Sequence, residues 1–277
     1  MLIHSTGVQP PLALQYGMFV KAAYDVYAKF PTKLNPSQSD YPSFPSGYKL
    51  LKNIQMSDFF RKTTTPKYYG FMAQNIANPS AYITAFRGTE TLEEWWDDFH
   101  WDLVPFSYMP NAGNVASGFL KIYSTMTFTS PNSKSASTPK DITKLGGIKL
   151  SAPNATMVAV GHSLGAALIT LYGFNLVAKG TNPVVYTFAS PRVGDTAFAN
   201  AYDANVAMNY RIVNWPDLVP RFPKDIFDNY KHVKGEYLVD SLDHPLTVKP
   251  TFECFHSLLT YLFLVGAPAS ILGACKV

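Results

Sequence analysis

The stretch V-A-V-G-H-S-L-G-A-A-L, from Val158 to Leu168, decides the fold that we expect for this chain. A short run rich in β-branched residues, Thr156 to Val160, predicts a buried strand. Apolar residues recur at helical spacing from Ala166 to Ala178 and predict a helix that covers this strand. The sequence therefore predicts a strand, a turn and a helix in immediate succession.

The turn between these two elements, Gly161-His162-Ser163-Leu164-Gly165, has the G-x-S-x-G pattern of a nucleophile elbow. The two glycines remove side chains that would clash where the strand bends into the helix. The serine hydroxyl is then exposed at the tip, and the amides of the helix N-terminus point at the same spot. Such a pattern also occurs by chance as a glycine-rich turn, so the flanking strand and helix carry the catalytic interpretation.

The composition predicts one globular domain that spans residues 1–277. Hydrophobic residues make up 47% of the 277 residues and charged residues only 15%, which is ample material for one large core. The 17 tyrosines and 19 phenylalanines must lie in that core or line an apolar cleft. The formal charge of +4 is mild and its basic residues are scattered, so we expect no nucleic-acid partner.

Both ends of the chain bear on its location. The first residues, M-L-I-H-S-T-G-V-Q-P-P, lack the basic and apolar regions of a signal peptide. From Phe255 to Ala274 the sequence carries no formal charge apart from a possible proton on His256, but Gly266 and Pro268 interrupt the apolar run. We therefore expect a buried helix that ends near Val265, not a membrane span.

Only two cysteines, Cys254 and Cys275, occur in the chain. They are too few for a disulfide scaffold, and they are close enough in sequence to form one bridge. Two reduced and buried thiols are an equal alternative.

Strand-like and helix-like segments alternate along the rest of the chain. Lys67–Asn75 and Ala81–Arg87 predict two strands joined by a turn at Asn78-Pro79. The other expected elements are helices over Pro11–Phe30, Val115–Phe128 and Ala197–Asp203, strands over Val184–Ala189 and Tyr210–Asn214, a late antiparallel strand over His232–Val239, and a C-terminal helix that opens at His256. This order predicts an α/β fold with a mainly parallel central sheet and helices on both faces.

The segment Glu90 to Met109 concentrates three of the four tryptophans, Trp95, Trp96 and Trp101, among acidic residues. A surface helix with its aromatic face in the core would explain any one of them. Together they are more than packing usually requires, so a substrate-contacting role is the alternative.

A serine hydroxyl needs an imidazole to take its proton and a carboxylate to orient that imidazole. In an α/β sheet with a nucleophile elbow, the acid and then the histidine follow the serine along the chain. His232, His244 and His256 follow Ser163, and the apolar setting of His256 favours it over a strand and a loop position.

For the acid, Asp217 follows the predicted strand Tyr210–Asn214, and catalytic groups collect at the carboxyl ends of such strands. Asp195 is placed to cap the helix that follows it. The aspartates Asp225, Asp228, Asp240 and Asp243 lie in a polar stretch that is typical of solvated surface.

Six motifs in order carry a family resemblance: A-F-R-G-T, V-A-S-G-F, G-H-S-L-G-A-A-L, T-F-A-S-P-R-V-G-D, N-W-P-D-L-V-P-R-F-P and F-H-S-L-L-T-Y. Over about residues 12–264 the chain resembles the class 3 lipases, the fungal-type triacylglycerol lipases with their feruloyl esterase relatives. The resemblance implies an α/β-hydrolase fold with Ser163 as nucleophile, Asp217 as orienting acid and His256 as general base. It also implies an oxyanion hole from Thr89 and Leu164.

The resemblance implies further that Glu90–Met109 is a lid over the site and that the protein is secreted. Two features depart from the family pattern. Ala116 stands where the family usually has the histidine of V-H-x-G-F, and two cysteines allow fewer disulfides than fungal members tend to have.

The sequence thus predicts a serine carboxylester hydrolase that acts on acylglycerol lipids, at a lipid–water interface, as a monomer, with no metal and no cofactor. Within the enzymes, the alternatives are a feruloyl or other carboxylic-ester esterase and a phospholipase A1. From another class, the alternative is a catalytically silent lipid-binding module. The presence of Ser163, Asp217 and His256 in the required order argues against the silent module.

Overall fold

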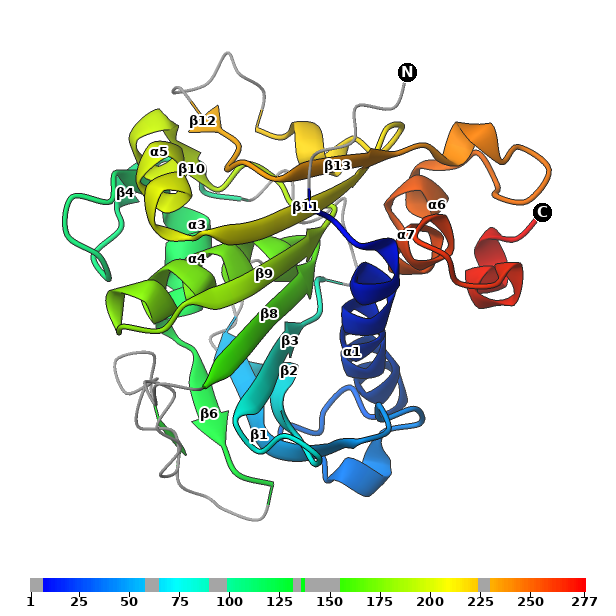
Figure 1. Cartoon of the computed structure of the whole chain (residues 1–277), viewed down its shortest axis with the longest axis horizontal. Coiled ribbons are helices and arrows are strands. Elements are labelled where there is room, and N and C mark those ends of the chain that lie inside the picture. The colour runs from blue at the N-terminus through cyan, green and yellow to red at the C-terminus, as the bar shows by residue number, and fades with distance from the viewer. Residues whose placement is uncertain (1–6, 58–64, 90–98, 132–135, 138–154, 224–229) are drawn as a thin grey trace.

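A computed structural model describes residues 7–57, 65–89, 99–131, 136–137, 155–223 and 230–277. Its centre is a nine-stranded sheet with the order β13-β11-β9-β8-β3-β2-β1-β6-β7 (Figure 1). These strands are β1 (Tyr48–Ser57), β2 (Pro66–Asn75), β3 (Ala81–Phe86), β6 (Thr127–Thr129), β7 (Ala136–Ser137), β8 (Thr156–His162), β9 (Pro183–Phe188), β11 (Met208–Asn214) and β13 (Glu236–Val239).

The sheet is parallel in one half and antiparallel in the other. Strands β3, β8, β9, β11 and β13 pair in parallel, with Phe86 opposite Gly161 and His162 opposite Phe188. In the other half, antiparallel pairing runs through β3, β2, β1, β6 and β7. Strands β2 and β3 are antiparallel because a short turn at Asn78-Pro79 joins them, as the sequence predicts. The parallel half is the part that ends at the predicted site residues, and the whole sheet is mixed.

Helices cover both faces of the sheet, which confirms that expectation (Figure 1). One face carries α1 and α7, and the other carries α3, α4 and α5. The helices are α1 (Pro10–Lys29), α3 (Ser117–Ser124), α4 (Leu164–Ala178), α5 (Thr196–Asn205), α6 (Phe252–His256) and α7 (Leu258–Leu264), with short 3-10 turns η1 (Gln38–Asp40), η3 (Val219–Arg221), η4 (Ser241–Asp243) and η5 (Ala269–Cys275).

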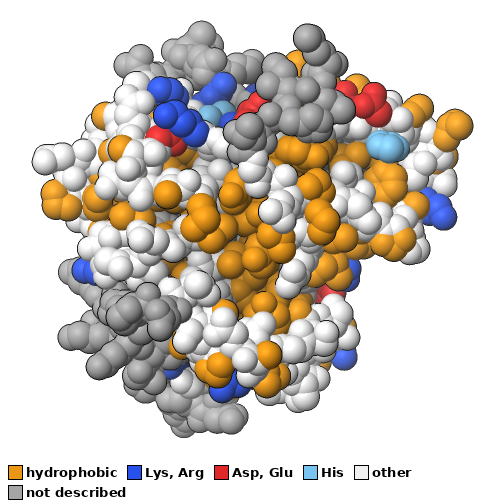
Figure 2. All heavy atoms as spheres, viewed as in Figure 1, with side chains coloured by type: hydrophobic (Ala, Val, Ile, Leu, Met, Phe, Trp, Pro, Cys, Tyr) orange, Lys and Arg blue, Asp and Glu red, His pale blue; other side chains and the backbone are white. Residues whose placement is uncertain are grey.

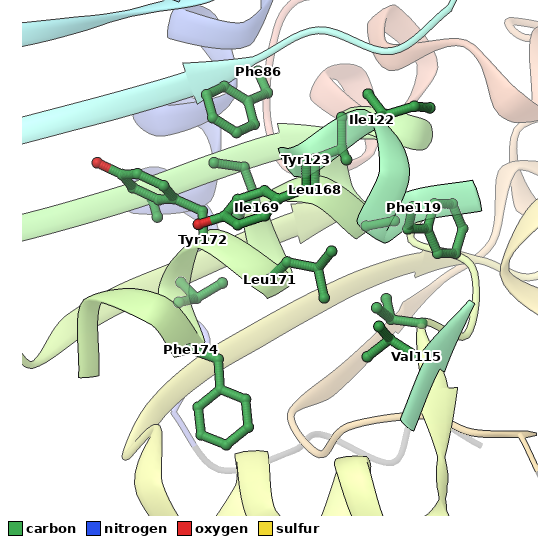
Figure 3. Close-up of a cluster of buried hydrophobic side chains, with 14 of the residues drawn as sticks. Phe86, Val115, Phe119, Ile122, Tyr123, Leu168, Ile169, Leu171, Tyr172 and Phe174 are labelled. Atoms are coloured by element: carbon green, nitrogen blue, oxygen red, sulfur yellow. The ribbon is translucent and has the colours of Figure 1, made fainter. Parts of the chain in front are cut away.

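The α4 side of the sheet holds the larger hydrophobic cluster (Figure 3). Helix α4 is apolar on all sides, and from Leu164 to Leu176 all its side chains are buried, because it lies between the sheet and helices α3 and α5. Figure 3 shows Leu168 and Ile169 of α4 beside Ile122 and Tyr123 of α3. The residue that begins α4 is therefore held by the most completely buried helix of the fold.

The α1 side is built around α1, which begins with Pro10 and Pro11 and ends at Lys29, close to the expected bounds. Gly17 lets α1 approach the sheet and α7, since a Cβ there would lie 2.4 Å from Leu262 Cδ2. Figure 2 shows hydrophobic side chains on the surface between α1 and the strands beside it, where Val158 and Val184 are only partly buried.

A second, four-stranded antiparallel sheet lies beside α5, with the order β12-β10-β5-β4. Its strands are β4 (Leu103–Pro105), β5 (Asn114–Ala116), β10 (Gly194–Asp195) and β12 (Tyr230–Lys231). Asp195 caps α5, as the sequence predicts, by accepting a 2.7 Å hydrogen bond from the Phe198 amide. Ala116, which stands where the family usually has a histidine, is fully buried in β5 and packs in the hydrophobic core.

Of the expected lid range, Glu90–Met109, the structure describes residues 99–109, and aromatic residues among these pack against the rest of the chain. Phe99 is buried, and the Trp101 ring lies 4.3 Å from the Phe99 ring and 5.9 Å from the Phe119 ring, between ring centroids. The hydroxyl of Tyr230 also donates to the Trp101 carbonyl. Trp101 thus packs against Phe99 and Phe119, while Trp95 and Trp96 lie outside the described residues.

Three further expectations differ from the structure. The segment 115–128 is not one helix, because α3 is flanked by β5 and β6, whose backbones pair with other strands. Strand β13 is parallel to β11, not antiparallel. His256 ends α6 instead of opening the C-terminal helix, because the backbone leaves the helical region at Ser257 before α7 begins.

The two cysteines form a disulfide between Cys254 and Cys275, so of the two alternatives the bridge is correct. The bridge joins α6 to the C-terminal turn η5. Among the described residues, no helix has both the length and the apolar character needed to cross a membrane.

Candidate active site

The elbow predicted from G-x-S-x-G has the geometry that its glycines require. Strand β8 ends at His162 and α4 begins at Leu164, so Ser163 is the single residue between strand and helix. Its φ of 58° and ψ of −128° are strained for a residue with a Cβ. Because α4 starts at Leu164, the amide of Leu164 is among the first-turn amides that have no acceptor within the helix.

Both glycines of the elbow lie where no side chain fits. A Cβ on Gly161 would lie 2.4 Å from the Gly165 carbonyl oxygen, and a Cβ on Gly165 would lie 2.4 Å from the Arg87 carbonyl oxygen. The second contact joins the elbow to the end of β3. The G-x-S-x-G spacing therefore fixes the packing of the elbow against the A-F-R-G-T segment as well as the turn itself.

The segment after β3, from Arg87 to Thr89, packs against the elbow through Gly88. Gly88 lies so close to the elbow that a Cβ on it would be 2.9 Å from Ser163 Cβ. The buried guanidinium of Arg87 donates to the carbonyls of Tyr68 (2.9 Å) and Gly88 (2.6 Å). It also lies over the Tyr27 ring, 3.4 Å from the ring centroid. Arg87 thus holds the backbone that presents Thr89.

Asp217 and His256 meet although 39 positions separate them in the chain. Asp217 follows the carboxyl end of β11, is 1% exposed, and places Oδ2 2.9 Å from His256 Nδ1. A carboxylate can only accept, so Nδ1 carries a proton and the neutral imidazole leaves a lone pair on Nε2. His256 is itself 4% exposed, and its tautomer is the one that a proton acceptor at Nε2 needs.

Two more donors fix the Asp217 carboxylate. The Tyr261 hydroxyl donates to Oδ2 at 2.7 Å, and the Val219 amide donates to Oδ1 at 3.0 Å. Burial, and then the charge of Asp217, raise the pKa of Tyr261, so its hydroxyl stays protonated and remains a donor. The same hydroxyl accepts from the Asn214 amide at 3.0 Å, which joins the carboxylate to β11.

Three of the predicted site residues present buried polar atoms that no described residue satisfies. These atoms are Thr89 Oγ1, Ser163 Oγ and His256 Nε2. Buried polar atoms without a partner are rare and costly, and they are expected where a reacting group binds. The structure therefore leaves a hydroxyl, an imidazole nitrogen and a second hydroxyl available in one region.

The sequence analysis names Ser163, Asp217 and His256 but not the residues that contact them in the structure. Tyr261 and Arg87 lie within the motifs F-H-S-L-L-T-Y and A-F-R-G-T, next to residues that were assigned. An aromatic hydroxyl five positions after the histidine is a usable signal only when the break between α6 and α7 is known. Asn214 gives no signal beyond its place at a strand end.

Residues 83–227, more than half of the chain, match the model of the family described as Lipase (class 3). The chain belongs to the class 3 lipase family. This class 3 lipase chain is 34% identical to Phospholipase A1-II 3 of Oryza sativa subsp. indica over 204 residues, which cover 66% of this chain and 48% of that protein.

A second relative of the class 3 lipase chain is Secreted mono- and diacylglycerol lipase 1 of Fusarium solani, 30% identical over 174 residues, which cover 62% of this chain and 48% of that protein. The chain spans about half the length of these curated relatives. The crystal structure of mono- and diacylglycerol lipase from Aspergillus oryzae superposes with a TM-score of 0.62 at 25% identity, covering 84% of this chain and 80% of that one. The fold is that of the α/β-hydrolases.

Proposed function

We propose that this class 3 lipase chain is a serine carboxylester hydrolase that cleaves acyl esters of glycerolipids through an acyl-enzyme. The observation that carries the proposal is the 2.9 Å contact between Asp217 Oδ2 and His256 Nδ1, which leaves Nε2 as the proton acceptor in the region of Ser163. Family membership supports the same chemistry.

In the first half-reaction, Ser163 Oγ attacks the ester carbonyl while its proton passes to His256 Nε2. The imidazolium keeps its Nδ1–H on Asp217, whose negative charge stabilises it. The carbonyl oxygen becomes an oxyanion and accepts from the amides of Leu164 and Thr89, with the Thr89 hydroxyl as a further donor. His256 then gives the proton to the departing alcohol, and an acyl ester remains on Ser163.

In the second half-reaction, a water molecule gives a proton to His256 Nε2 and attacks the acyl carbonyl. The oxyanion forms in the same place, and collapse returns the proton to Ser163 Oγ as the fatty acid leaves. Every proton that the reaction moves passes through Nε2. A fixed Nδ1–Asp217 contact is therefore the structural requirement of both halves.

The decisive experiment compares the wild-type protein with Ser163→Ala on p-nitrophenyl butyrate. The substitution removes one oxygen, and we expect the rate to fall by roughly 10⁴-fold or more because no nucleophile remains. Ser124→Ala is the matched control, since the exposed Ser124 hydroxyl bonds to the Lys121 carbonyl at the end of α3, outside the proposed chemistry. Hydrolysis unchanged by Ser163→Ala would leave a silent lipid-binding module as the better interpretation.

Phospholipase A1 activity is a second candidate, because a relative that carries this name is 34% identical. Mono- and diacylglycerol hydrolysis is favoured by the Fusarium solani relative and the Aspergillus oryzae structure. A panel of mixed vesicles separates the two: a phosphatidylcholine labelled at sn-1, a diacylglycerol and a triacylglycerol emulsion. A feruloyl ester in the same panel tests the esterase alternative. From the sequence and the family resemblance we also propose that Glu90–Met109 acts as a lid whose Trp95, Trp96 and Trp101 contribute contacts to the acyl chain.

We also propose that the protein works outside the cell as a monomer. The Cys254–Cys275 disulfide and the word "Secreted" in the name of one relative support the location. Blocking free thiols in protein collected from the natural source, with and without reduction, tests whether the bridge is present there. Size-exclusion chromatography with light scattering tests the assembly.

A further inference from the structure

A continuous chain of hydrogen bonds links four residues beside the proposed site. The Gly88 amide bonds to the Tyr24 hydroxyl oxygen at 2.7 Å, and that hydroxyl lies 2.9 Å from His162 Nδ1. On its other side, His162 Nε2 lies 2.8 Å from the backbone carbonyl oxygen of His256. Three short contacts thus join four residues that are far apart in the sequence.

The direction of each bond follows from the groups at its two ends. The His256 carbonyl can only accept, so His162 Nε2 must carry a proton and donate it. A neutral imidazole then has a bare Nδ1, which accepts from the Tyr24 hydroxyl. The Gly88 amide can only donate, and it donates to a lone pair of the Tyr24 hydroxyl oxygen. One tautomer and one direction of hydrogen bonding satisfy all four groups.

The setting of His162 keeps it neutral. Its side chain is 4% exposed, and its ring lies 4.8 Å from the His256 ring, between centroids. Burial, and then the nearby charge of His256 when protonated, lower the pKa of His162 well below its usual value. The His256 imidazole, by contrast, must gain a proton during the proposed reaction, so the two histidines have different tasks.

The chain of bonds connects the three segments on which the proposed chemistry depends: the residues after β3, the end of β8 and the end of α6. Gly88 precedes Thr89, whose amide is assigned to the oxyanion hole. His162 precedes Ser163, and the third bond ends on the backbone of His256 itself. Tyr24 supplies the link from α1, which shares no loop with any of them.

We propose that Tyr24 and His162 are positioning residues that set the distance between the oxyanion amide of Thr89, the hydroxyl of Ser163 and the imidazole of His256. This proposal rests on the proposed ester hydrolysis. Neither side chain is hydrogen-bonded to Ser163 Oγ or His256 Nε2, so their effect is on the reaction rate of bound substrate and not on substrate binding. A misplacement of about 1 Å in such a site costs up to roughly 10²-fold in rate.

The test uses Tyr24→Phe, His162→Gln and the double variant, each with p-nitrophenyl butyrate and with the melting temperature. Tyr24→Phe keeps the ring and removes the hydroxyl. His162→Gln keeps an N–H that can reach the His256 carbonyl and loses the acceptor at Nδ1. Tyr16→Phe is the control on the same helix, because the Tyr16 ring packs on Tyr186 away from this chain of bonds.

We expect each single variant to lose roughly 10- to 100-fold in kcat with KM within about twofold. The double variant should lose no more than the worse single variant, because each substitution breaks the same chain of bonds. Multiplied losses, or a Tyr24→Phe kcat within about twofold of wild type, would overturn the proposal.

The ¹⁵N NMR spectrum of the histidine side chains in the wild-type protein reports the tautomer of His162 and needs neither a variant nor activity. We expect His162 as the neutral Nε2–H tautomer at pH 7, and the Nδ1–H tautomer would overturn the proposal even if the variants fail to fold. If wild-type protein hydrolyses no ester but shows the Nε2–H tautomer, the proposed function fails while the hydrogen-bond chain stands as a structural feature without the positioning role.

Discussion

Tyr261 and His256 bind the same oxygen of Asp217, the Tyr261 hydroxyl at 2.7 Å and His256 Nδ1 at 2.9 Å. The carboxylate therefore receives a neutral donor beside the imidazole that it orients. Since Tyr261 lies on α7 and His256 at the end of α6, the short break between these helices brings both donors to one atom.

Replacing Tyr261 with phenylalanine should lower kcat about 10-fold with little change in KM, because a hydrogen bond to a charged acceptor contributes about 1.5–3 kcal/mol. Initial rates on p-nitrophenyl butyrate measure the effect. Tyr210→Phe is the control, since the Tyr210 ring packs against Tyr186 in the sheet. An unchanged kcat in Tyr261→Phe would mean that the Val219 amide and the His256 imidazole suffice to hold Asp217.

Alanine substitutions at Gly165, in the first turn of α4, and at Gly180, just after its end, should lower the unfolding free energy by different amounts. At Gly165 the new Cβ would meet the Arg87 carbonyl oxygen at 2.4 Å, and we expect a loss of about 3 kcal/mol in unfolding free energy together with loss of activity. At Gly180, just after α4, φ is +81° and nothing lies within 4 Å, so Gly180→Ala should cost about 1 kcal/mol from backbone strain alone.

Urea unfolding of both glycine variants measures the difference. Equal costs would show that the elbow relaxes away from Arg87 without resistance. Activity should survive in Gly180→Ala at temperatures well below its melting point.

Removing the disulfide with Cys254→Ala and Cys275→Ala should lower the unfolding free energy by about 3 kcal/mol, given its sequence separation of 21 residues. Either single substitution breaks the same bond, so each should cost nearly as much as the pair. Denaturant titration of all three variants checks this, and costs that simply add would contradict it. Cys254 lies two residues before His256 on α6. The activity that remains in the double variant therefore shows how far the disulfide also holds the His256 imidazole in position.

Stability should fall as the pH drops below about 6.5, the ordinary histidine value. Burial, and then the charge of Arg211, lower the pKa of His232 well below that value in the folded protein. The unfolded chain therefore binds a proton that the folded chain does not, and stability is lost as acid is added, by up to about 1.4 kcal/mol per pH unit for this histidine.

The variant His232→Gln isolates this contribution, because glutamine keeps an N–H for the Pro220 carbonyl that His232 Nε2 contacts. Urea unfolding at pH 7, 6 and 5 should give a shallower slope for the variant than for wild type. Parallel slopes would place the acid sensitivity elsewhere, with buried His162 as the next group to replace.

The sequence predicts the parts of this molecule that local pattern or chain order controls. The elbow follows from two glycines and a strand–helix context, and the order of Ser163, Asp217 and His256 follows from how such sheets are wound. The direction of β13 does not follow, because the connection from β11 could close either way. The partners of His162 do not follow either, since Tyr24 lies 138 positions away and only the packed fold brings them together.

The aromatic residues Phe99 and Trp101 show the same limit in another form. Aromatic residues between acidic ones predicted one continuous segment, whereas Phe99 and Trp101 pack against Phe119 of α3. Composition alone cannot separate an aromatic residue that meets substrate from one that meets the core, because both need the same side chain. Contact partners from α3 and β12 supply the distinction.

The short turn at Asn78 and Pro79 has a practical consequence. Residues 76–79 are exposed and precede β3, while Thr89 follows the other end of that strand, so the turn and the proposed site lie at opposite ends of β3. A coupling tag inserted at this turn would attach the protein to a solid support with the proposed active site facing the solution. Beads prepared in this way would admit bulky emulsified lipid, which random attachment through scattered lysines would obstruct.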